Sequence, residues 1–387
     1  EPMYVSRWAE EKIKKLFDIF PVVVLTGPRQ VGKTTTAKMF SEEGAYVNFD
    51  DIYALHSAKI DPKSIIPDSE LVVIDEVQRF PEILLVIKEI VDKDANRKFL
   101  LTGSSSLLVM KGVSESLAGR AGYVTMYPFT IGEVMEKPPN LPDLLKGEVS
   151  DAEPPGFSFS DLLKKGLFPK PFFMDGGWNE WYRMYVTTYV EKEFRMLSNI
   201  VDLSSFASFM VMSFHSISSL FNESEIAKEI GVSQPTVHRY SSILTSLNIS
   251  IKLPVFSKSS GGVKKRVKLY AIDPALVRYT LHLDLTEEWE GKLLENLVFN
   301  QLKVQIDIMN GQLFYYRSKN LEVDFLVKKG EILTLFEVKR SGTTLRTLKR
   351  LVETKKDLNA TAAYIVTIEG KPRELSSGVW EIPFWMI

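Results

Sequence analysis

The chain has 387 residues, 45% apolar and 25% charged, a composition that predicts a soluble globular protein with about two to four domains. Its formal net charge is −1, so any contact with nucleic acid has to come from a local basic patch. The absence of cysteine excludes disulfides, thiolate zinc sites and cysteine nucleophiles, and the four scattered histidines disfavour a histidine metal site. No signal peptide and no apolar run of about 18 residues is found, which predicts a cytoplasmic protein without membrane contact.

Residues 3–20 predict an amphipathic helix, which leads into the stretch that organises the chain. Residues 22–26 have the apolar, β-branched pattern of a buried strand, and the sequence soon afterwards turns helical. Between strand and helix lies the pattern G-x-x-x-x-G-K-S/T, which predicts a loop whose backbone N–H groups surround the phosphates of ATP. Lys33 is placed to reach the β- and γ-phosphates, and the Thr34 hydroxyl is placed to hold Mg²⁺. The predicted nucleotide-binding residues are Gly27, Pro28, Arg29, Gln30, Val31, Gly32, Lys33, Thr34 and Thr35.

A second pair of candidate residues follows another buried strand. Residues 45–51 predict a strand and residues 54–69 a polar connection, after which the apolar run 71–74 ends in Asp75 and Glu76. Because ligands bind at the carboxyl ends of parallel strands, we expect Asp75 to hold the Mg²⁺ of the nucleotide. Glu76 is then placed to orient and deprotonate the attacking water. The alternative is an exposed acidic pair without a function.

Two further candidates lie downstream of these acids. Residues 98–106 predict a strand that lies between the two nucleotide-binding strands and ends in a hydroxyl cluster. Ser104 is thereby presented to the γ-phosphate or to the water, and the same serines can also form a helix N-cap. Arg120 stands between glycines at the start of an apolar strand over residues 123–127. We expect it to act as an arginine finger on the nucleotide of a neighbouring subunit, with a surface salt bridge as the alternative.

These motifs resemble the AAA+ ATPases of the prokaryotic AAA_14/DUF4143 group, and the resemblance extends over nearly the whole chain. It rests first on residues 25–35, 74–78, 101–105 and 117–120. It implies a nucleotide-binding α/β domain in which Thr34 and Asp75 hold Mg²⁺ and Glu76 is the catalytic carboxylate. It also implies that Ser104 takes the first sensor position and that Arg120 is a candidate arginine finger.

Residues 136–180 are rich in proline and glycine and predict a linker with short helices that closes the first domain. The helical pattern over residues 181–195 resembles the linking helix of the same group. Its stripe of aromatic side chains predicts a packed core.

Residues 225–240 predict two helices joined by a glycine turn, which resembles a helix-turn-helix. Apolar side chains pack the two helices together and leave polar side chains of the second helix outward, where such a helix reads the major groove. Residues 249–256 and 263–271 flank a Gly/Ser-rich turn and predict a hairpin consistent with a wing. The predicted DNA-contacting residues are Gln234, Thr236, His238 and Arg239 on the helix and Lys258, Lys264, Lys265, Arg266 and Lys268 on the hairpin. The alternative is a protein-interaction or lid module.

The C-terminal part carries a second acidic group. A strand–turn–strand pattern there predicts a hairpin in which Glu337 and Lys339 share one face and Asp324 comes alongside, while Glu295 enters from a helix. Asp324 and Glu337 are predicted to bind Mg²⁺, which polarises a phosphodiester, and Lys339 to position or activate the water. The pattern resembles the PD-(D/E)XK nuclease fold, some relatives of which are inactive or serve other purposes.

The predicted fold class is α/β: an AAA+ P-loop parallel sheet, then a winged-helix module and a restriction-endonuclease-like α/β domain. The predicted boundaries are 1–135 for the ATPase domain, 136–200 for linker and lid helices, 201–285 for the winged helix-turn-helix and 286–387 for the nuclease-like domain. The predicted function is ATP- and Mg²⁺-dependent turnover coupled to DNA engagement and metal-dependent cleavage, in a homo-oligomer if Arg120 acts in trans. The alternatives are a non-cleaving switch that recruits a protein partner and a DNA motor without nuclease activity.

Overall fold

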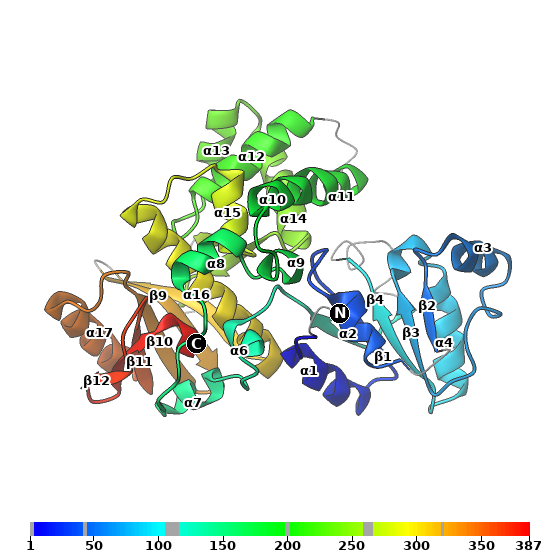
Figure 1. Ribbon diagram of the computed structural model, residues 1–387, viewed down its shortest axis with the longest axis horizontal. Helices are drawn as coiled ribbons and strands as arrows, with labels where there is room; N and C mark the ends of the chain where they lie inside the picture. Colours follow the sequence, from blue (N-terminus) through cyan, green and yellow to red (C-terminus); the bar gives the residue numbers. More distant parts are fainter. Residues whose placement is uncertain (1–3, 42–44, 105–115, 198–201, 258–265, 319–320) are drawn as a thin grey trace. The chain divides into compact units, whose positions relative to one another are not determined.

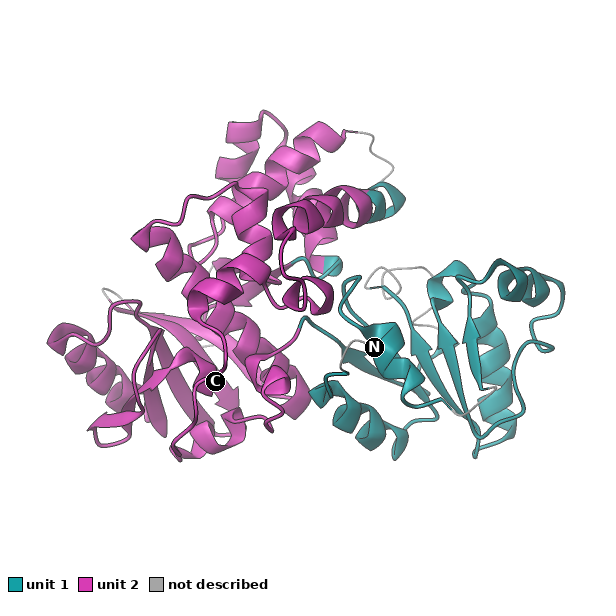
Figure 2. Ribbon diagram, in the orientation of Figure 1, with its two compact units in different colours: residues 1–128, 192–199, 246–249 teal, residues 129–191, 200–245, 250–387 magenta. Residues whose placement is uncertain are grey.

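The computed structural model describes residues 4–41, 45–104, 116–197, 202–257, 266–318 and 321–387. The chain divides into two compact units (Figure 2). Unit 1 comprises Glu1–Pro128, Lys192–Asn199 and Ser246–Ile249, and unit 2 comprises Phe129–Glu191, Ile200–Thr245 and Ser250–Ile387. Among the described residues, none of the helices combines the length and the apolar character that a membrane crossing requires.

Unit 1 is built on a five-stranded sheet in which all neighbouring strands are parallel, in the order β2-β3-β4-β1-β5 (Figure 1). The strands are β1 (Val22–Thr26), β2 (Tyr46–Asn48), β3 (Leu71–Asp75), β4 (Lys98–Thr102) and β5 (Ala121–Thr125). The helical elements are α1 (Trp8–Phe17), α2 (Lys33–Lys38), α3 (Ile52–Ile60), η1 (Val77–Arg79) and α4 (Ile83–Lys93). β4 lies between β1 and β3, as predicted, so the carboxyl ends of these three strands meet at one edge. This is the sheet of a P-loop NTPase fold.

The connection after β2 differs from the prediction. Residues 54–69 are not a polar connection throughout, because helix α3 (Ile52–Ile60) occupies their first part. Ala58 is the buried side chain of this helix, whereas Tyr53 and Ile60 are 84% and 73% exposed. Apolar residues on the solvent side remove the helical periodicity on which the prediction depended.

Unit 2 combines helices with a mixed six-stranded sheet in the order β12-β13-β11-β10-β9-β8. The pairs β10–β11 and β11–β13 are parallel, and the other three pairs are antiparallel. Its strands are β8 (Gln312–Ser318), β9 (Leu321–Lys329), β10 (Ile332–Val338), β11 (Ala362–Thr367), β12 (Arg373–Ser376) and β13 (Val379–Pro383), and a separate hairpin is formed by β6 (Ser250–Pro254) and β7 (Val267–Ala271). The fold class of the chain is therefore α/β, as predicted.

The helical elements that precede and flank this sheet are short in the first half of the unit and longer in the second. They are α6 (Ile131–Val134), α7 (Leu141–Lys146), α8 (Phe159–Lys165), α9 (Pro169–Phe172), α10 (Trp178–Tyr185), η3 (Val186–Val190), α12 (Leu203–His215), α13 (Glu223–Ile230), α14 (Gln234–Ser246), α15 (Pro274–Thr280), α16 (Glu287–Met309), α17 (Leu345–Leu358) and η4 (Phe384–Met386), with α11 (Glu191–Leu197) at the change to unit 1. α17 covers one face of the sheet, where Leu351 and Leu358 pack in an apolar cluster with strand residues such as Leu335.

The predicted helix over residues 181–195 is present but is not uniform. α10 continues through the π-helical turn η3 into α11. Its aromatic stripe is core, as predicted: Tyr182 and Tyr185 are almost fully buried, and Trp181 stacks on Tyr185 with ring centroids 5.3 Å apart.

Asp273 is a buried carboxylate that joins three segments of unit 2. It accepts backbone hydrogen bonds from Leu167 at 2.6 Å and from Ala275 and Leu276, at the start of α15, at 2.8 and 3.3 Å. The Tyr182 hydroxyl donates a fourth bond from α10 at 3.3 Å. Burial raises the pKa of Asp273 to about 6, although these hydrogen bonds act to lower it.

We therefore expect Asp273→Asn to have a pH-dependent effect on stability. A folded-state pKa above the unfolded value gives a contribution that is present below the unfolded pKa and lost as pH rises through about 6. The variant is less stable because Asn replaces one acceptor oxygen with an NH₂ group. Its stability deficit should shrink by roughly 1 to 2 kcal/mol between pH 5 and pH 8. Urea unfolding of both proteins at the two pH values measures this, and a deficit that grows with pH would contradict it.

Candidate functional site

The P-loop begins where β1 ends, and its first glycine is required by close packing. Gly27 has a φ of 139°, and a Cβ atom there would lie 2.1 Å from the backbone oxygen of Met126. No other residue fits without moving the backbone. Gly32, with a φ of 96°, precedes the first residue of α2 and completes the turn into that helix. The sequence pattern thus forms the strand–loop–helix arrangement of a phosphate-binding loop.

Lys33 is buried inside this loop. Its Nζ donates hydrogen bonds to the backbone oxygens of Gly27 and Pro28, at 3.0 and 2.7 Å. Burial lowers the pKa of Lys33 to about 8, an effect that the nearby Glu76 carboxylate partly offsets. An ammonium group at the N-terminus of a helix is placed to bind phosphate oxygens.

Asp75, at the end of β3, is 1% exposed and held by two hydroxyl groups. The Tyr46 hydroxyl donates to its Oδ2 at 2.7 Å, and the Thr102 hydroxyl donates to its Oδ1. Neither hydroxyl was predicted, although Thr102 ends the strand that the sequence placed beside β3. Thr34 lies in the first turn of α2, and its hydroxyl oxygen, like the Asp75 carboxylate, is a hard donor of the kind that suits Mg²⁺ together with nucleotide phosphates.

Glu76 has a left-handed backbone, with a φ of 59°, directly after β3. Its N–H donates to the Thr102 hydroxyl oxygen at 3.3 Å, and Gln78 donates to its carboxylate at 2.5 Å. Arg29 lies 3.9 Å from the same carboxylate. Burial raises the pKa of Glu76, and the positive charges of Arg29 and Lys33 oppose that shift. Backbone strain at a half-buried carboxylate is typical of functional positions.

Arg29 also binds a residue that the sequence did not bring into the site. Its Nε donates to Glu193 at 2.7 Å, and Glu193 is 4% exposed. Glu193 belongs to the segment of α11 that falls in unit 1. The prediction placed Arg29 in the nucleotide loop, and the structure adds that its side chain links the loop to a segment far along the chain. No sequence signal marks this pair, because its members are 164 positions apart.

Ser104 lies two residues beyond β4 and is 3% exposed. It follows the strand between β1 and β3, and so lies at the same edge of the sheet as the P-loop and Asp75. The serines after it lie outside the described residues.

Arg120 lies at the amino ends of the strands, away from the carboxyl ends where the P-loop and Asp75 lie. It precedes β5, which runs parallel to β1 with Ala121 opposite Val22, whereas the P-loop follows the far end of β1. Its guanidinium forms two hydrogen bonds to Asp92, at 2.6 and 2.9 Å. Within unit 1, therefore, Arg120 is not brought together with Lys33 and Glu76.

The second group of predicted residues comes together in unit 2. Glu337 is the penultimate residue of β10 and lies next to Asp324 of β9: the Asp324 N–H lies 3.4 Å from the Glu337 carboxylate, and Val338 donates to Asp324 at 2.8 Å. Lys339 is 2.8 Å from Glu337. Glu295, on α16, accepts a hydrogen bond from the Tyr270 hydroxyl at 2.6 Å.

The carboxylates of Asp324, Glu337 and Glu295 are poorly hydrated and repel one another. Burial and the negative charge of Asp324 raise the pKa of Glu337 to about 7 and that of Glu295 to about 8. Arg350, which was not predicted, donates to Glu337 at 2.5 Å. Within the part of the chain that the structure describes, no group of three or more His, Cys, Asp or Glu side chains is arranged to hold a metal ion.

Lys268 corrects one prediction. It does not belong to an exposed basic tip, because it is buried in β7, where its Nζ forms an ion pair with Glu322 at 2.5 Å and lies 3.8 Å from Glu295. The prediction was wrong because the Lys268 side chain is buried, where two carboxylates from distant parts of the chain compensate its charge. Arg266 is exposed, whereas Lys258, Lys264 and Lys265 lie outside the described residues.

The predicted pair of helices is present as α13 and α14. Gln234, His238 and Arg239 of α14 are exposed, and Thr236 is half-buried. Val237 and Tyr240 of the same helix are buried, as predicted. His238 lies 3.0 Å from Glu223, which also accepts a hydrogen bond from Lys252 at 3.1 Å.

Three family models match successive parts of the chain. The family model of the AAA domain AAA_14 matches residues 20–135, a domain of unknown function, DUF8612, matches residues 157–287, and another, DUF4143, matches residues 290–387. The uncharacterized protein Rv2008c of Mycobacterium tuberculosis is 28% identical over 355 residues, covering 87% of this chain and 74% of the relative. The uncharacterized protein MJ1544 of Methanocaldococcus jannaschii is 24% identical over 326 residues, covering 79% and 72%.

Solved structures at low sequence identity are also similar to the chain. The Walker-type ATPase PABY2304 of Pyrococcus abyssi has a TM-score of 0.45 and 14% identity, covering 72% of this chain and 96% of that one. The Aeropyrum pernix ORC1 protein has a TM-score of 0.28 and 14% identity, covering 73% and 93%. The matched domains and the P-loop geometry lead to one conclusion: this chain belongs to the AAA_14–DUF4143 group of P-loop ATPases.

Proposed function

We propose that this chain hydrolyses ATP with Mg²⁺ and uses the nucleotide state of unit 1 to control the engagement of DNA by unit 2. One observation carries the first half: Lys33, Asp75 and Glu76 lie at the carboxyl ends of β1 and β3, with β4 between them. We also propose the three modules outlined by the sequence: an ATPase domain to about residue 135, a winged helix over residues 201–285 and a nuclease-like domain from residue 286.

For hydrolysis, Thr34 and Asp75 would hold Mg²⁺. The ion supplies neutralisation of the charge on the transferred phosphate. Lys33 binds the phosphates, and Glu76 accepts the proton of the attacking water, a role favoured by the raised pKa of its half-buried carboxylate. Ser104 contacts the γ-phosphate or the water, and Arg29 orients Glu76.

The DNA contact is supported by the polar surface of α14. Gln234, His238 and Arg239 are exposed and Thr236 is half-buried, whereas the core residues Val237 and Tyr240 of the same helix are buried. The β6–β7 hairpin follows, and the bridge between Ile217 and Leu269 adds a further backbone pair beside it. Three helices followed by such a hairpin are the arrangement of a winged helix, whose second helix enters the major groove.

Metal-dependent cleavage is the proposed task of the second cluster. Asp324 and Glu337 would hold Mg²⁺, and a cation there relieves the repulsion that raises the pKa of Glu337 to about 7. When bound, such an ion would supply the activation of a water for attack on a phosphodiester. Lys339 positions that water, and Glu295 adds negative charge from α16.

A specific observation favours a second candidate, a non-cleaving ATP-driven switch that recruits a protein partner. Lys339 and Arg350 both bind Glu337, and two cations already compensate a carboxylate that a metal would need. In this function the cluster has a structural role and the DNA or protein partner is bound without cleavage.

Assembly is the remaining part of the proposal. Because Arg120 lies at the sheet edge opposite the P-loop, it can act on a nucleotide only from another subunit. The chain would then be a homo-oligomer, and the Asp92 ion pair would hold the arginine in place until subunits meet.

The test is cleavage of plasmid and single-stranded DNA with Mg²⁺ or Mn²⁺, with and without ATP, by wild type, Lys339→Ala and Lys33→Ala. We expect Lys339→Ala to lose cleavage while it keeps ATP turnover, because Lys339 lies in unit 2. We expect Lys33→Ala to lose ATP turnover and the ATP response of cleavage. If the wild-type protein binds DNA but never cleaves it, the result would contradict the nuclease function and favour the non-cleaving switch.

A further inference from the structure

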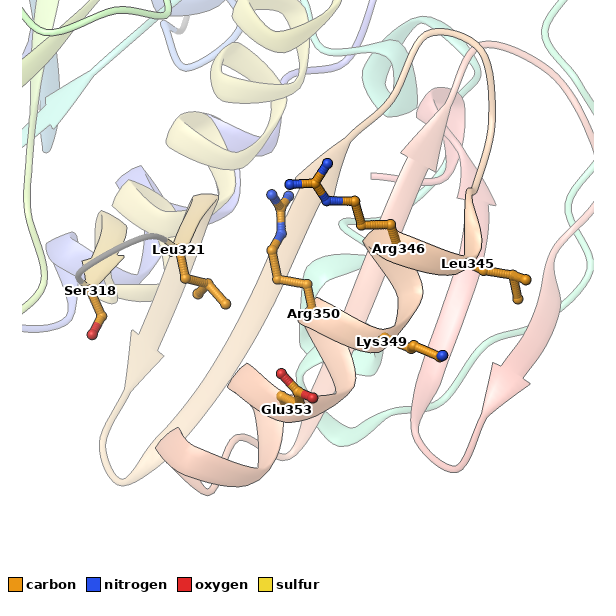
Figure 3. Close-up of a pocket in the computed structure, with 7 residues that line it drawn as sticks. All are labelled: Ser318, Leu321, Leu345, Arg346, Lys349, Arg350 and Glu353. Carbon is orange, nitrogen blue, oxygen red and sulfur yellow. The ribbon is translucent and has the colours of Figure 1, made fainter.

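A pocket of about 650 Å³ beside α17 has no part in the function proposed above (Figure 3). It is lined by Ser318, Leu321, Leu345, Arg346, Lys349, Arg350 and Glu353. Three of these residues carry positive charge and one carries negative charge. The pocket is therefore basic, in a chain whose net charge is −1.

The cations gather here because of helical spacing. Arg346, Lys349 and Arg350 stand at positions i, i+3 and i+4 of α17 and so lie on neighbouring turns of one face. The other face of the helix packs on the sheet through Leu351 and Leu358. In addition, residues 339–352 contain five Lys or Arg and no Asp or Glu, so no carboxylate within that stretch neutralises the group.

Two of the three cations have no acidic partner among the described residues. Arg350 binds Glu337, and the nearby Arg340 binds Glu290, but neither Arg346 nor Lys349 lies within ion-pair distance of a carboxylate there. Figure 3 shows the guanidinium groups of Arg346 and Arg350 extending toward one another. Like charges side by side are unfavourable unless an anion lies between them.

The pocket adjoins the carboxylate cluster. Arg350 lines the pocket and its Nη2 donates to Glu337 at 2.5 Å, so a single side chain belongs to both. An anion that occupies the pocket competes with Glu337 for this guanidinium. Planar guanidinium groups bind phosphate, as they bind carboxylate, through paired hydrogen bonds, so a phosphate group fits this site.

We propose that this pocket binds backbone phosphates of a nucleic-acid strand and thereby holds the strand against the Glu337 cluster. Arg346 and Lys349 neutralise the phosphates, Arg350 shares its guanidinium between phosphate and Glu337, and Leu321 and Leu345 contact the sugar and base. The inference rests on the proposed engagement of DNA by unit 2, and it adds a second contact beyond the α14 surface. An acidic protein segment could bind the same cations, but its binding would not explain why the pocket lies next to the Glu337 carboxylate cluster.

The experiment measures the binding of labelled single-stranded and duplex DNA to the full chain by fluorescence anisotropy over a range of salt. Arg346→Ala/Lys349→Ala is compared with Lys355→Ala/Lys356→Ala, which removes two cations from the last turn of the same helix. We expect about tenfold weaker binding for the first variant and a salt slope that is less steep by about 2. The control should bind like wild type.

Each other outcome has a separate meaning. Wild type that does not bind DNA refutes the proposed DNA engagement itself. Equal losses in both variants would show that overall charge matters and the pocket does not. Displacement of DNA by inorganic phosphate at concentrations near those of the DNA phosphates would indicate a small-anion site instead of a strand site. Loss of polyglutamate binding but not of DNA binding in the first variant would assign the pocket to an acidic protein. Unchanged ATP turnover shows that the variants are folded.

Discussion

Glu76→Gln is expected to lower ATP turnover by about 100-fold or more while nucleotide binding is kept. The carboxylate is half-buried and its pKa is raised by that partial burial, which makes it a better proton acceptor than an exposed glutamate. Glutamine preserves the size of the side chain and a hydrogen-bond partner for Gln78, but it cannot take a proton from water. Steady-state phosphate release measures turnover, and titration with a fluorescent ATP analogue measures binding.

The matched control for this substitution is Glu82→Gln. Glu82 is an exposed glutamate at the start of α4 in the same unit, so the change of charge is identical. Its turnover should stay at the wild-type level. Unimpaired turnover in Glu76→Gln would remove Glu76 from the role of base, and loss of binding in that variant would assign it to nucleotide affinity instead.

Gly27→Ala should destabilise unit 1 by about 3 kcal/mol or more, because the added Cβ meets backbone and cannot be accommodated by a side-chain rotation. The φ of 139° adds strain of its own. Displacement of the loop from Met126 also moves the N–H groups that would surround phosphates, so ATP binding should be lost together with stability. Thermal unfolding followed by circular dichroism, with and without ATP, measures both effects.

Gly119→Ala separates conformational strain from the clash. Gly119 has a φ of 74°, also in the left-handed region, but a Cβ there meets no atom within 4 Å. We expect a cost of about 1 kcal/mol, from the backbone conformation alone. A Gly27→Ala protein as stable as Gly119→Ala would mean that the loop can move away from Met126 without loss.

The sequence predicted the strands and the helix around the P-loop pattern because its signals there are local. The P-loop pattern fixes Lys33 and Thr34 relative to one strand and one helix, and an apolar run that ends in acids marks Asp75 and Glu76. Strand order then follows from the rules of parallel sheets, which correctly placed β4 between β1 and β3. Each of these inferences uses residues that are adjacent in the chain.

The parts that were missed depend on contacts between distant residues. Tyr46 reaches Asp75 from the neighbouring strand, Glu193 reaches Arg29 from beyond the linker, and Arg350 reaches Glu337 from the following helix. A basic residue near a Gly/Ser turn is normally exposed, so the sequence placed Lys268 on the surface. Helix α3 was missed because its apolar side chains are largely exposed.

The buried β7 strand has a consequence for where the C-terminal domain can be cut. A fragment that started at α16 would contain the whole six-stranded sheet, yet it would leave Glu295 and Glu322 without the Lys268 ammonium that compensates them. It would also uncover Phe299, whose ring stacks on Tyr270 with centroids 4.4 Å apart. A fragment that folds therefore has to begin before β7, upstream of the domain that carries Glu295 and Glu337. An insertion between β7 and α16 would have to leave the contacts of β7 with Glu295, Glu322 and Phe299 intact.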